Sequence, residues 1–301
     1  MTSTSKTVVF FGNERLVSGL ASTDAPLLRG LIAEGYHIAA VVSHHSESSS
    51  RNQRPLEVAE IAAEHNIPVL LPNKPLEILE QLVRYNADAA ILSAYGRIIP
   101  QSIIDIFPFG IINVHPSLLP KYRGSTPIES AVINGDTKTG VSIMQLAAEM
   151  DAGPVFAQTE IPLTGTETKF EVYDQLSSKG AELLLQILPD ILDGELRAIP
   201  QNESAASYCS LLEKSDAWLD ANSLTATEAE RKVRAHLEFP KTKMKLANKD
   251  IVITKAHVVE AKENILDIVC NEDTYLRIDE LIGPSGRKMD GKSFLNGYAA
   301  G

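Results

Sequence analysis

An amide, an imidazole and a carboxylate occur in this chain at spacings that could bring them into one small site. Asn113 and His115 stand two residues apart at the end of the apolar run 110–114, and Asp151 follows after a hairpin-length segment. Residues two apart on a strand point to the same face, so these two side chains project together. An amide donor beside an imidazole that gives or takes a proton suits a carbonyl turning into an oxyanion.

The segments that must position these residues alternate between apolar runs and helical periodicity. We expect strands at 7–11, 38–42, 68–71, 87–92 and 110–114, with helices at 25–34, 56–64 and 76–85. Apolar runs without alternation, separated by helices, are typical of a parallel sheet covered on both faces. The pattern predicts a doubly wound, Rossmann-like α/β domain, whose ligands bind at the carboxyl ends of the strands.

The pattern changes in the last third of the chain. A strand at 155–161 and a long helix at 169–188 are followed by a segment that contains Gly194, Pro200 and Asn202 and has the character of a linker. A helix at 225–236 and strands at 244–246, 251–256, 265–269 and 275–281 then predict a small β-barrel. We therefore expect a catalytic domain over 1–192, a linker over 193–207 and a second domain over 208–301.

Composition excludes several classes of protein. No run approaches the roughly 20 apolar residues of a membrane span, and the N-terminus has no apolar signal core. Cys209 and Cys270 are the only cysteines, so we expect a reducing cytoplasm and no structural zinc. Asn13 to Arg15 follow Gly12 in place of a G-x-G-x-x-G loop, which argues against a dinucleotide-dependent oxidoreductase. The His44-His45 pair lacks a matching metal-ligand pattern.

Charge is distributed unevenly along the chain. The net charge of −11 argues against broad affinity for nucleic acid. Residues 231–255, however, carry eight basic side chains against two acidic ones, a net charge of +6. A patch that follows phosphates needs only a few Lys or Arg contacts, and its binding falls with salt. A solvated surface that happens to be basic is the alternative.

The central motifs resemble those of the folate-dependent formyltransferases. The similar segments are Asn113-Val114-His115-Pro116 with the following Ser117 to Gly124, Thr139 to Ile143, Met150 to Pro154, and Ala94 to Pro100. The resemblance implies a formyltransferase domain followed by an OB-like domain. It also implies 10-formyltetrahydrofolate as the formyl donor and an amine as the acceptor, with no metal.

The resemblance further implies roles for individual residues. Asn113, His115 and Asp151 would form the catalytic trio. Asn113 and protonated His115 donate to the formyl oxygen, and Asp151 orients His115. The folate-contacting residues would be Tyr95, Gly96, Arg97, Ile98, Ser117, Leu118, Leu119 and Pro120.

The acceptor amine is less strongly implied than the chemistry. The second domain and its basic stretch favour initiator methionyl-tRNA, and thus translation initiation, with the enzyme acting as a monomer. The tRNA contacts would be Arg51 and Arg54 in the 44–54 loop, Lys121 and Arg123 at the pocket mouth, and Arg231, Lys232, Arg234, Lys241, Lys243 and Lys245. Glycinamide ribonucleotide enzymes end near the first domain. Sugar-nucleotide N-formyltransferases and a non-catalytic folate- or RNA-binding protein stay as alternatives.

Overall fold

A mixed seven-stranded sheet forms the centre of the first domain in the computed structural model, which describes residues 6–44 and 56–298. Its strand order is β3-β2-β1-β4-β5-β7-β8. The strands are β1 (Thr7–Gly12), β2 (His37–Val42), β3 (Val69–Leu70), β4 (Ala89–Ser93), β5 (Ile111–His115), β7 (Lys138–Gln145) and β8 (Val155–Pro162). The five strands from β1 to β5 run parallel, as the unalternating apolar runs predict.

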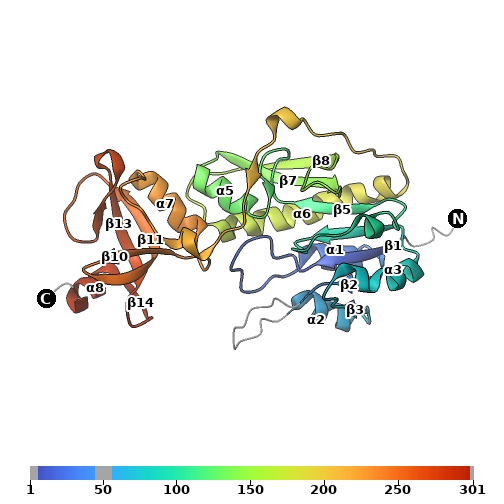
Figure 1. Cartoon of the computed structure of the whole chain (residues 1–301), viewed down its shortest axis with the longest axis horizontal. Coiled ribbons are helices and arrows are strands. Elements are labelled where there is room, and N and C mark those ends of the chain that lie inside the picture. Colours follow the sequence, from blue (N-terminus) through green and yellow to red (C-terminus); the bar gives the residue numbers. More distant parts are fainter. Residues whose placement is uncertain (1–5, 45–55, 299–301) are drawn as a thin grey trace.

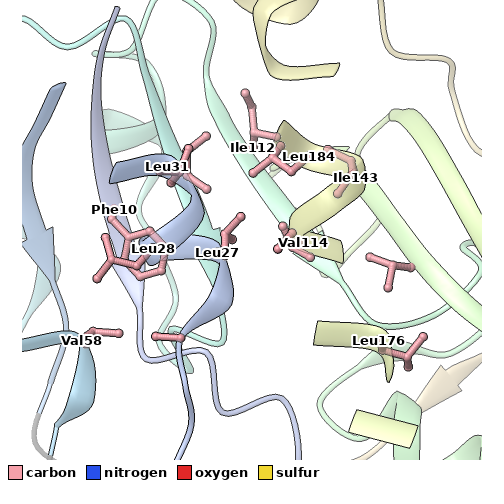
Figure 2. Close-up of a cluster of buried hydrophobic side chains, with 14 of the residues drawn as sticks. Phe10, Leu27, Leu28, Leu31, Val58, Ile112, Val114, Ile143, Leu176 and Leu184 are labelled. Carbon is pink, nitrogen blue, oxygen red and sulfur yellow. The ribbon is translucent and has the colours of Figure 1, made fainter. Parts of the chain in front are cut away.

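Helices cover both faces of this sheet. One face carries α1 (Pro26–Ala33), α2 (Glu57–Glu64) and the 24-residue α6 (Lys169–Leu192), and the other carries α3 (Leu79–Tyr85), preceded by a 3-10 turn at Pro75–Ile78, and α4 (Gln101–Ile104). Alternate strand residues serve the two cores: Phe10 packs with Leu28 on the first face (Figure 2), and Phe11 lies in the second core with Leu82. The predicted two-sided α/β domain is confirmed. Within the described residues no helix is long and apolar enough to cross a membrane.

The last two strands of the sheet extend it beyond the five strands predicted to be parallel. β7 pairs antiparallel with β5, and β8 pairs antiparallel with β7. The chain between β5 and β7 contains α5 (Pro127–Asn134) but does not cross back to the amino edge of the sheet, so β7 starts beyond the point where β5 ends. The loop 146–154 then joins β7 to β8, and this loop carries Asp151.

The second domain is an antiparallel sheet with a helix on each side of it in sequence. Its strands, in the order β10-β11-β13-β12 with β14 on β13, are β10 (Thr242–Leu246), β11 (Lys249–Val259), β12 (Asp267–Val269), β13 (Tyr275–Ile282) and β14 (Lys288–Asp290). α7 (Ala226–Ala235) and α8 (Gly291–Tyr298) share one core with this sheet, in which Val233, Ile253 and Phe294 are buried. The sequence predicted the first of these helices but not α8 or β14.

The chain between α6 and α7 does more than connect the two domains. It crosses the first domain before it reaches the second (Figure 1). It contains the 3-10 turn Glu203–Ala205, the short strand β9 (Tyr208–Cys209) and a second 3-10 turn at Lys214–Ala217. β9 pairs in parallel with β6 (Arg123–Gly124) of the first domain. Residues predicted to open the second domain therefore complete a small sheet of the first.

The two domains meet where α7 packs against α5 and the start of α6. The Lys169 ammonium, fully buried, donates to the carbonyl of Phe239 at 2.9 Å and lies 3.7 Å from the Glu129 carboxylate. Arg234 donates to the carbonyl of Glu167, and the Arg231 guanidinium occupies the space beside Gly135. Part of the basic stretch thus holds the domains together.

His236, at the end of α7, gives this junction a specific response to acid. Its ring is buried, and neither ring nitrogen has a hydrogen-bond partner among the described residues. Burial, together with the charges of Lys232 and Lys169, lowers the pKa of His236 from 6.5 to about 4. The unfolded chain therefore takes up this proton near pH 6.5, whereas the folded protein takes it up only near pH 4.

We expect the free energy of unfolding to fall as pH decreases through this window, by up to roughly 3 kcal/mol from this one group. His236→Leu removes the titrating ring and should make the loss between pH 6.5 and 4 correspondingly smaller. Urea unfolding of both proteins at several pH values measures the difference in slope. Parallel pH profiles would contradict the assignment.

Candidate active site

Asn113 and His115 lie on the same face at the carboxyl end of β5. Ile112 and Val114 pack into the core beneath α6 (Figure 2), so the two residues that alternate with them point to the opposite face. Both polar side chains are buried. Burying an amide and an imidazole carries a free-energy cost unless they find partners, and this makes their surroundings informative.

Oxygen atoms face both ring nitrogens of His115. Nε2 donates to the carbonyl of Tyr122 at 2.9 Å, which requires a proton on that nitrogen. Nδ1 lies 3.7 Å from Asp151 Oδ2, an ion-pair separation that is longer than a hydrogen bond. Nε2 is thus engaged by the Tyr122 carbonyl, whereas Nδ1 faces a carboxylate at a distance that leaves room for another partner. The structure therefore brings together the imidazole and carboxylate that the sequence paired.

The Asp151 loop has a tightly constrained backbone. Asp151 has a left-handed conformation with φ 48°, and its Oδ2 accepts the N–H of Gly124 at 2.8 Å. A Cβ atom on Gly153 would come within 1.9 Å of the carbonyl oxygen of Gln145, so only glycine fits there. The Asp-Ala-Gly sequence thus has a steric reason, because the loop must turn closely over the end of β7.

Asn113 supplies a donor that nothing else uses. Its amide makes no hydrogen bond with any residue in 6–44 or 56–298, although the side chain is buried. Asn113 is 6% exposed, and its amide atoms are not fully enclosed, so a bound molecule can reach them. An accessible amide with no partner among the described residues, on the face that carries His115, suits a site that receives a carbonyl oxygen.

The Ser117–Pro120 segment, which was predicted to contact folate, forms a turn beside this site, and hydrogen bonds hold the turn in place. Ser142 Oγ donates to the carbonyl of Ser117 and accepts the N–H of Leu119, and Gln158 donates to the carbonyl of Leu119. Leu118 lies against Gly140, where a Cβ would come within 2.5 Å of its side chain. The turn is rigid because β7 and β8 hold it, and it leads directly from His115 to Tyr122.

The loop that follows β4 offers an apolar surface near the same edge of the sheet. Tyr95 is buried against Phe11, and its carbonyl is 2.7 Å from His44 Nε2. Arg97 donates to the carbonyls of Pro72 and Asn73, which ties the loop to the chain after β3. Ile98 is 90% exposed, an unusual position for an isoleucine and one that fits contact with a ligand.

Residues 14–188 match the formyl transferase family, and residues 211–299 match the formyl transferase C-terminal domain. The chain belongs to the formyl transferase family. It is 33% identical over 297 residues to the methionyl-tRNA formyltransferase of Methylococcus capsulatus, covering 94% of this chain and 96% of that one. It is 38% identical over 300 residues to the methionyl-tRNA formyltransferase of Nitrosococcus oceani, covering 94% and 92%.

Solved structures share the fold at lower identity. HypX from Aquifex aeolicus in complex with tetrahydrofolic acid aligns with a TM-score of 0.68 at 18% identity, and this chain spans 47% of that protein while 98% of this chain is covered. An N-formyltransferase from Helicobacter canadensis in complex with folinic acid and dTDP-3-aminofucose has a TM-score of 0.68 at 16% identity, covering 91% of this chain and 98% of that one. At these identities the likeness establishes the fold alone.

Two of the basic residues near the pocket of this formyl transferase are already paired. Lys121 is half exposed and forms an ion pair with Asp136 at 2.7 Å. Arg123 is fully buried, and its guanidinium donates to Gln201, Glu203 and Tyr208. This position differs from the predicted contact at the pocket mouth, because a side chain so enclosed cannot reach a polyanion. Arg51 and Arg54 lie outside the described residues.

The basic residues of the second domain also separate into two groups. Lys232 donates to the carbonyl of Trp218, and Lys241 pairs with Glu238 at 3.3 Å. Lys243 and Lys245 alternate with inward-facing residues of β10, and their ammonium groups have no hydrogen bond or ion pair with a described residue. Among the predicted tRNA contacts that the structure describes, these two lysines are the best placed to meet a phosphate.

Sequence reasoning missed Gln201. It lies in the predicted linker, where nothing in periodicity or motif marks it. Its side chain nevertheless donates hydrogen bonds to two carbonyls of the Asp151 loop. Only the spatial proximity of segments about 50 residues apart in sequence reveals it.

Proposed function

We propose that this protein transfers the formyl group of 10-formyltetrahydrofolate to the α-amine of initiator methionyl-tRNA. We infer the acceptor from the match through both domains to proteins named methionyl-tRNA formyltransferase, over 94% of this chain. The site described above supports the chemistry, because it holds an unpaired amide donor and an imidazole facing a carboxylate.

The residues have distinct roles in this transfer. The amine nitrogen attacks the formyl carbon, and negative charge develops on the formyl oxygen. Asn113 Nδ2 and His115 Nδ1 are the donors not committed to another acceptor at hydrogen-bond distance, so we assign both to that oxygen. Asp151 balances the imidazolium charge and takes the proton that the amine loses. The oxyanion then re-forms the carbonyl as the bond to the folate nitrogen breaks, and Asp151 passes the proton to that nitrogen.

The loop after β4 and the Ser117–Pro120 turn fit the folate donor. Ile98 presents an exposed apolar side chain, and Tyr95 and Arg97 fix the loop from beneath. These residues would hold the pterin ring against the end of the sheet. The bound folate supplies the activated formyl group, while the chain supplies its orientation.

The second domain supports an RNA acceptor. Lys243 and Lys245 project from β10, and we infer that its antiparallel sheet is an OB-like domain that binds the acceptor arm. The proposal keeps the predicted monomer. Charged tRNA as acceptor fits the predicted cytoplasmic location.

A competition of acceptors tests this proposal. The protein is incubated with 10-formyltetrahydrofolate and either methionyl-tRNA, a dTDP-amino sugar or glycinamide ribonucleotide, and formylated product is measured by mass spectrometry. We expect product with methionyl-tRNA alone. Product with an amino sugar alone would overturn the acceptor and keep the chemistry, whereas no product with any of the three would favour the non-catalytic alternative.

A further inference from the structure

Gln201 holds the backbone of the Asp151 loop from outside. Its Nε2 donates to the carbonyl of Asp151 and to the carbonyl of Gly153, both at 2.7 Å. The two carbonyls belong to the short segment 151–153, which begins inside the Glu149–Ala152 turn and carries the Asp151 carboxylate. One amide group therefore holds the backbone at Asp151 and two residues beyond it.

Arg123 in turn fixes the amide of Gln201. Its Nε and Nη2 donate to Gln201 Oε1 at 3.1 and 2.9 Å, which leaves the amide nitrogen of Gln201 directed at the loop. The other side of the guanidinium donates to both carboxylate oxygens of Glu203, at 2.9 and 2.7 Å. Planar guanidinium groups lock such bidentate partners in orientation. The hydrogen bonds from Arg123 to Glu203 raise the pKa of Arg123, so the guanidinium stays charged.

These contacts close a ring around Asp151. The residue after Arg123 is Gly124, whose N–H donates to Asp151 Oδ2 at 2.8 Å. Asp151 is thus held twice from the same short strand: its carboxylate directly by Gly124, and its backbone through Arg123 and Gln201. The N–H of Arg123 donates to the carbonyl of Ser207, and an antiparallel bridge joins Val155 to Ile199, so the linker packs against this ring.

We propose that Gln201 and Arg123 are positioning residues that set the distance between Asp151 and His115, so that the interdomain linker is part of the catalytic apparatus. This inference rests on the proposed role of Asp151 in formyl transfer. His115 Nδ1 and Asp151 Oδ2 are 3.7 Å apart, and a small movement of the loop changes their interaction strongly.

Gln201→Glu tests the ring with little change in side-chain volume. The variant keeps an oxygen for Arg123 but turns a carboxylate toward the carbonyls of Asp151 and Gly153, which repel it. Asn202→Asp is the matched control, because it adds the same charge one residue along and keeps the oxygen that accepts the N–H of Ser204. Gln201→Ala separates loss of the contacts from the added charge.

Steady-state kinetics distinguish a positioning role of Gln201 from a general disruption of the protein. We expect Gln201→Glu and Gln201→Ala to lower kcat about 10- to 100-fold, the scale of an ångström-sized misplacement, with KM for both substrates within about twofold. In an Asp151→Asn background Gln201→Glu should cost less than about twofold, since residues that act through one another are not additive. Equal losses in both backgrounds would overturn the proposal.

A spectroscopic readout does not depend on the acceptor. Labelling with carbonyl-13C arginine and 15N glycine selects the two Arg-Gly steps of the chain, Arg29-Gly30 and Arg123-Gly124. We expect the Gly124 amide to exchange with solvent about tenfold faster or more in Gln201→Glu, with Gly30 in α1 and the Asn202→Asp control unchanged. An unchanged Gly124 amide would overturn the ring, whereas inactivity of the parent toward methionyl-tRNA would overturn only the proposed function.

Discussion

His115→Ala is expected to lower the rate of formyl transfer by about 10³-fold or more, the largest effect of any single substitution in this protein. The variant loses the donor proposed for the formyl oxygen and the imidazole that Asp151 faces at 3.7 Å. Single-turnover formylation of methionyl-tRNA by mass spectrometry measures the loss.

The fold should survive this change, because His115 contributes one hydrogen bond, to the carbonyl of Tyr122, whose loss costs about 1–3 kcal/mol. Thermal unfolding and tetrahydrofolate binding check that the pocket persists. His65→Ala, at the exposed end of α2, is the control histidine and should keep full activity. Turnover within about tenfold of the parent in His115→Ala would contradict the mechanism.

Asp151→Asn is expected to lower kcat about 10²- to 10³-fold, within the range for loss of a positioned acid or base. The amide keeps an oxygen for the Gly124 N–H, so the loop stays in place while its charge disappears. Steady-state kinetics with both substrates separates kcat from KM, and we expect KM to change little.

Glu149→Gln is the matched control for Asp151→Asn. Glu149 is an exposed carboxylate in the same loop, and only its backbone carbonyl is hydrogen-bonded within the described part of the chain. The same loss of charge there should leave the rate unchanged. If the two variants slowed the reaction equally, the charge of the loop as a whole would matter rather than the carboxylate that faces His115.

The apolar runs predicted most of the first domain because they report burial directly. The strand predicted at 110–114 corresponds to β5, and the prediction that Asn113 and His115 share a face is confirmed by the packing of Ile112 and Val114. Direction was harder to predict. No residue pattern within Lys138–Gln145 shows that β7 runs antiparallel. Its direction and register depend on where the chain emerges from α5.

Arg123 shows why contacts between distant segments escape sequence reasoning. A lysine and an arginine beside a catalytic motif indicate a surface for anions, and that interpretation fits Lys121 better than Arg123. The burial of Arg123 depends on Gln201 and Glu203, about 80 residues later in a segment with the composition of a linker. The composition of a segment indicates how flexible it is. It does not indicate which of its carboxylates or amides will contact a distant residue.

The pairing of β9 with β6 changes where this chain can be divided. A fragment that stops at the end of α6 would keep every residue of the proposed catalytic trio and the whole seven-stranded sheet, yet lack Gln201, Glu203 and β9. A fragment that continues to Ser210, whose carbonyl accepts the hydroxyl of Thr126, would retain them. The segment needed for an intact site is therefore longer than the main sheet suggests, and a chimera built from this chain should be joined after Ser210.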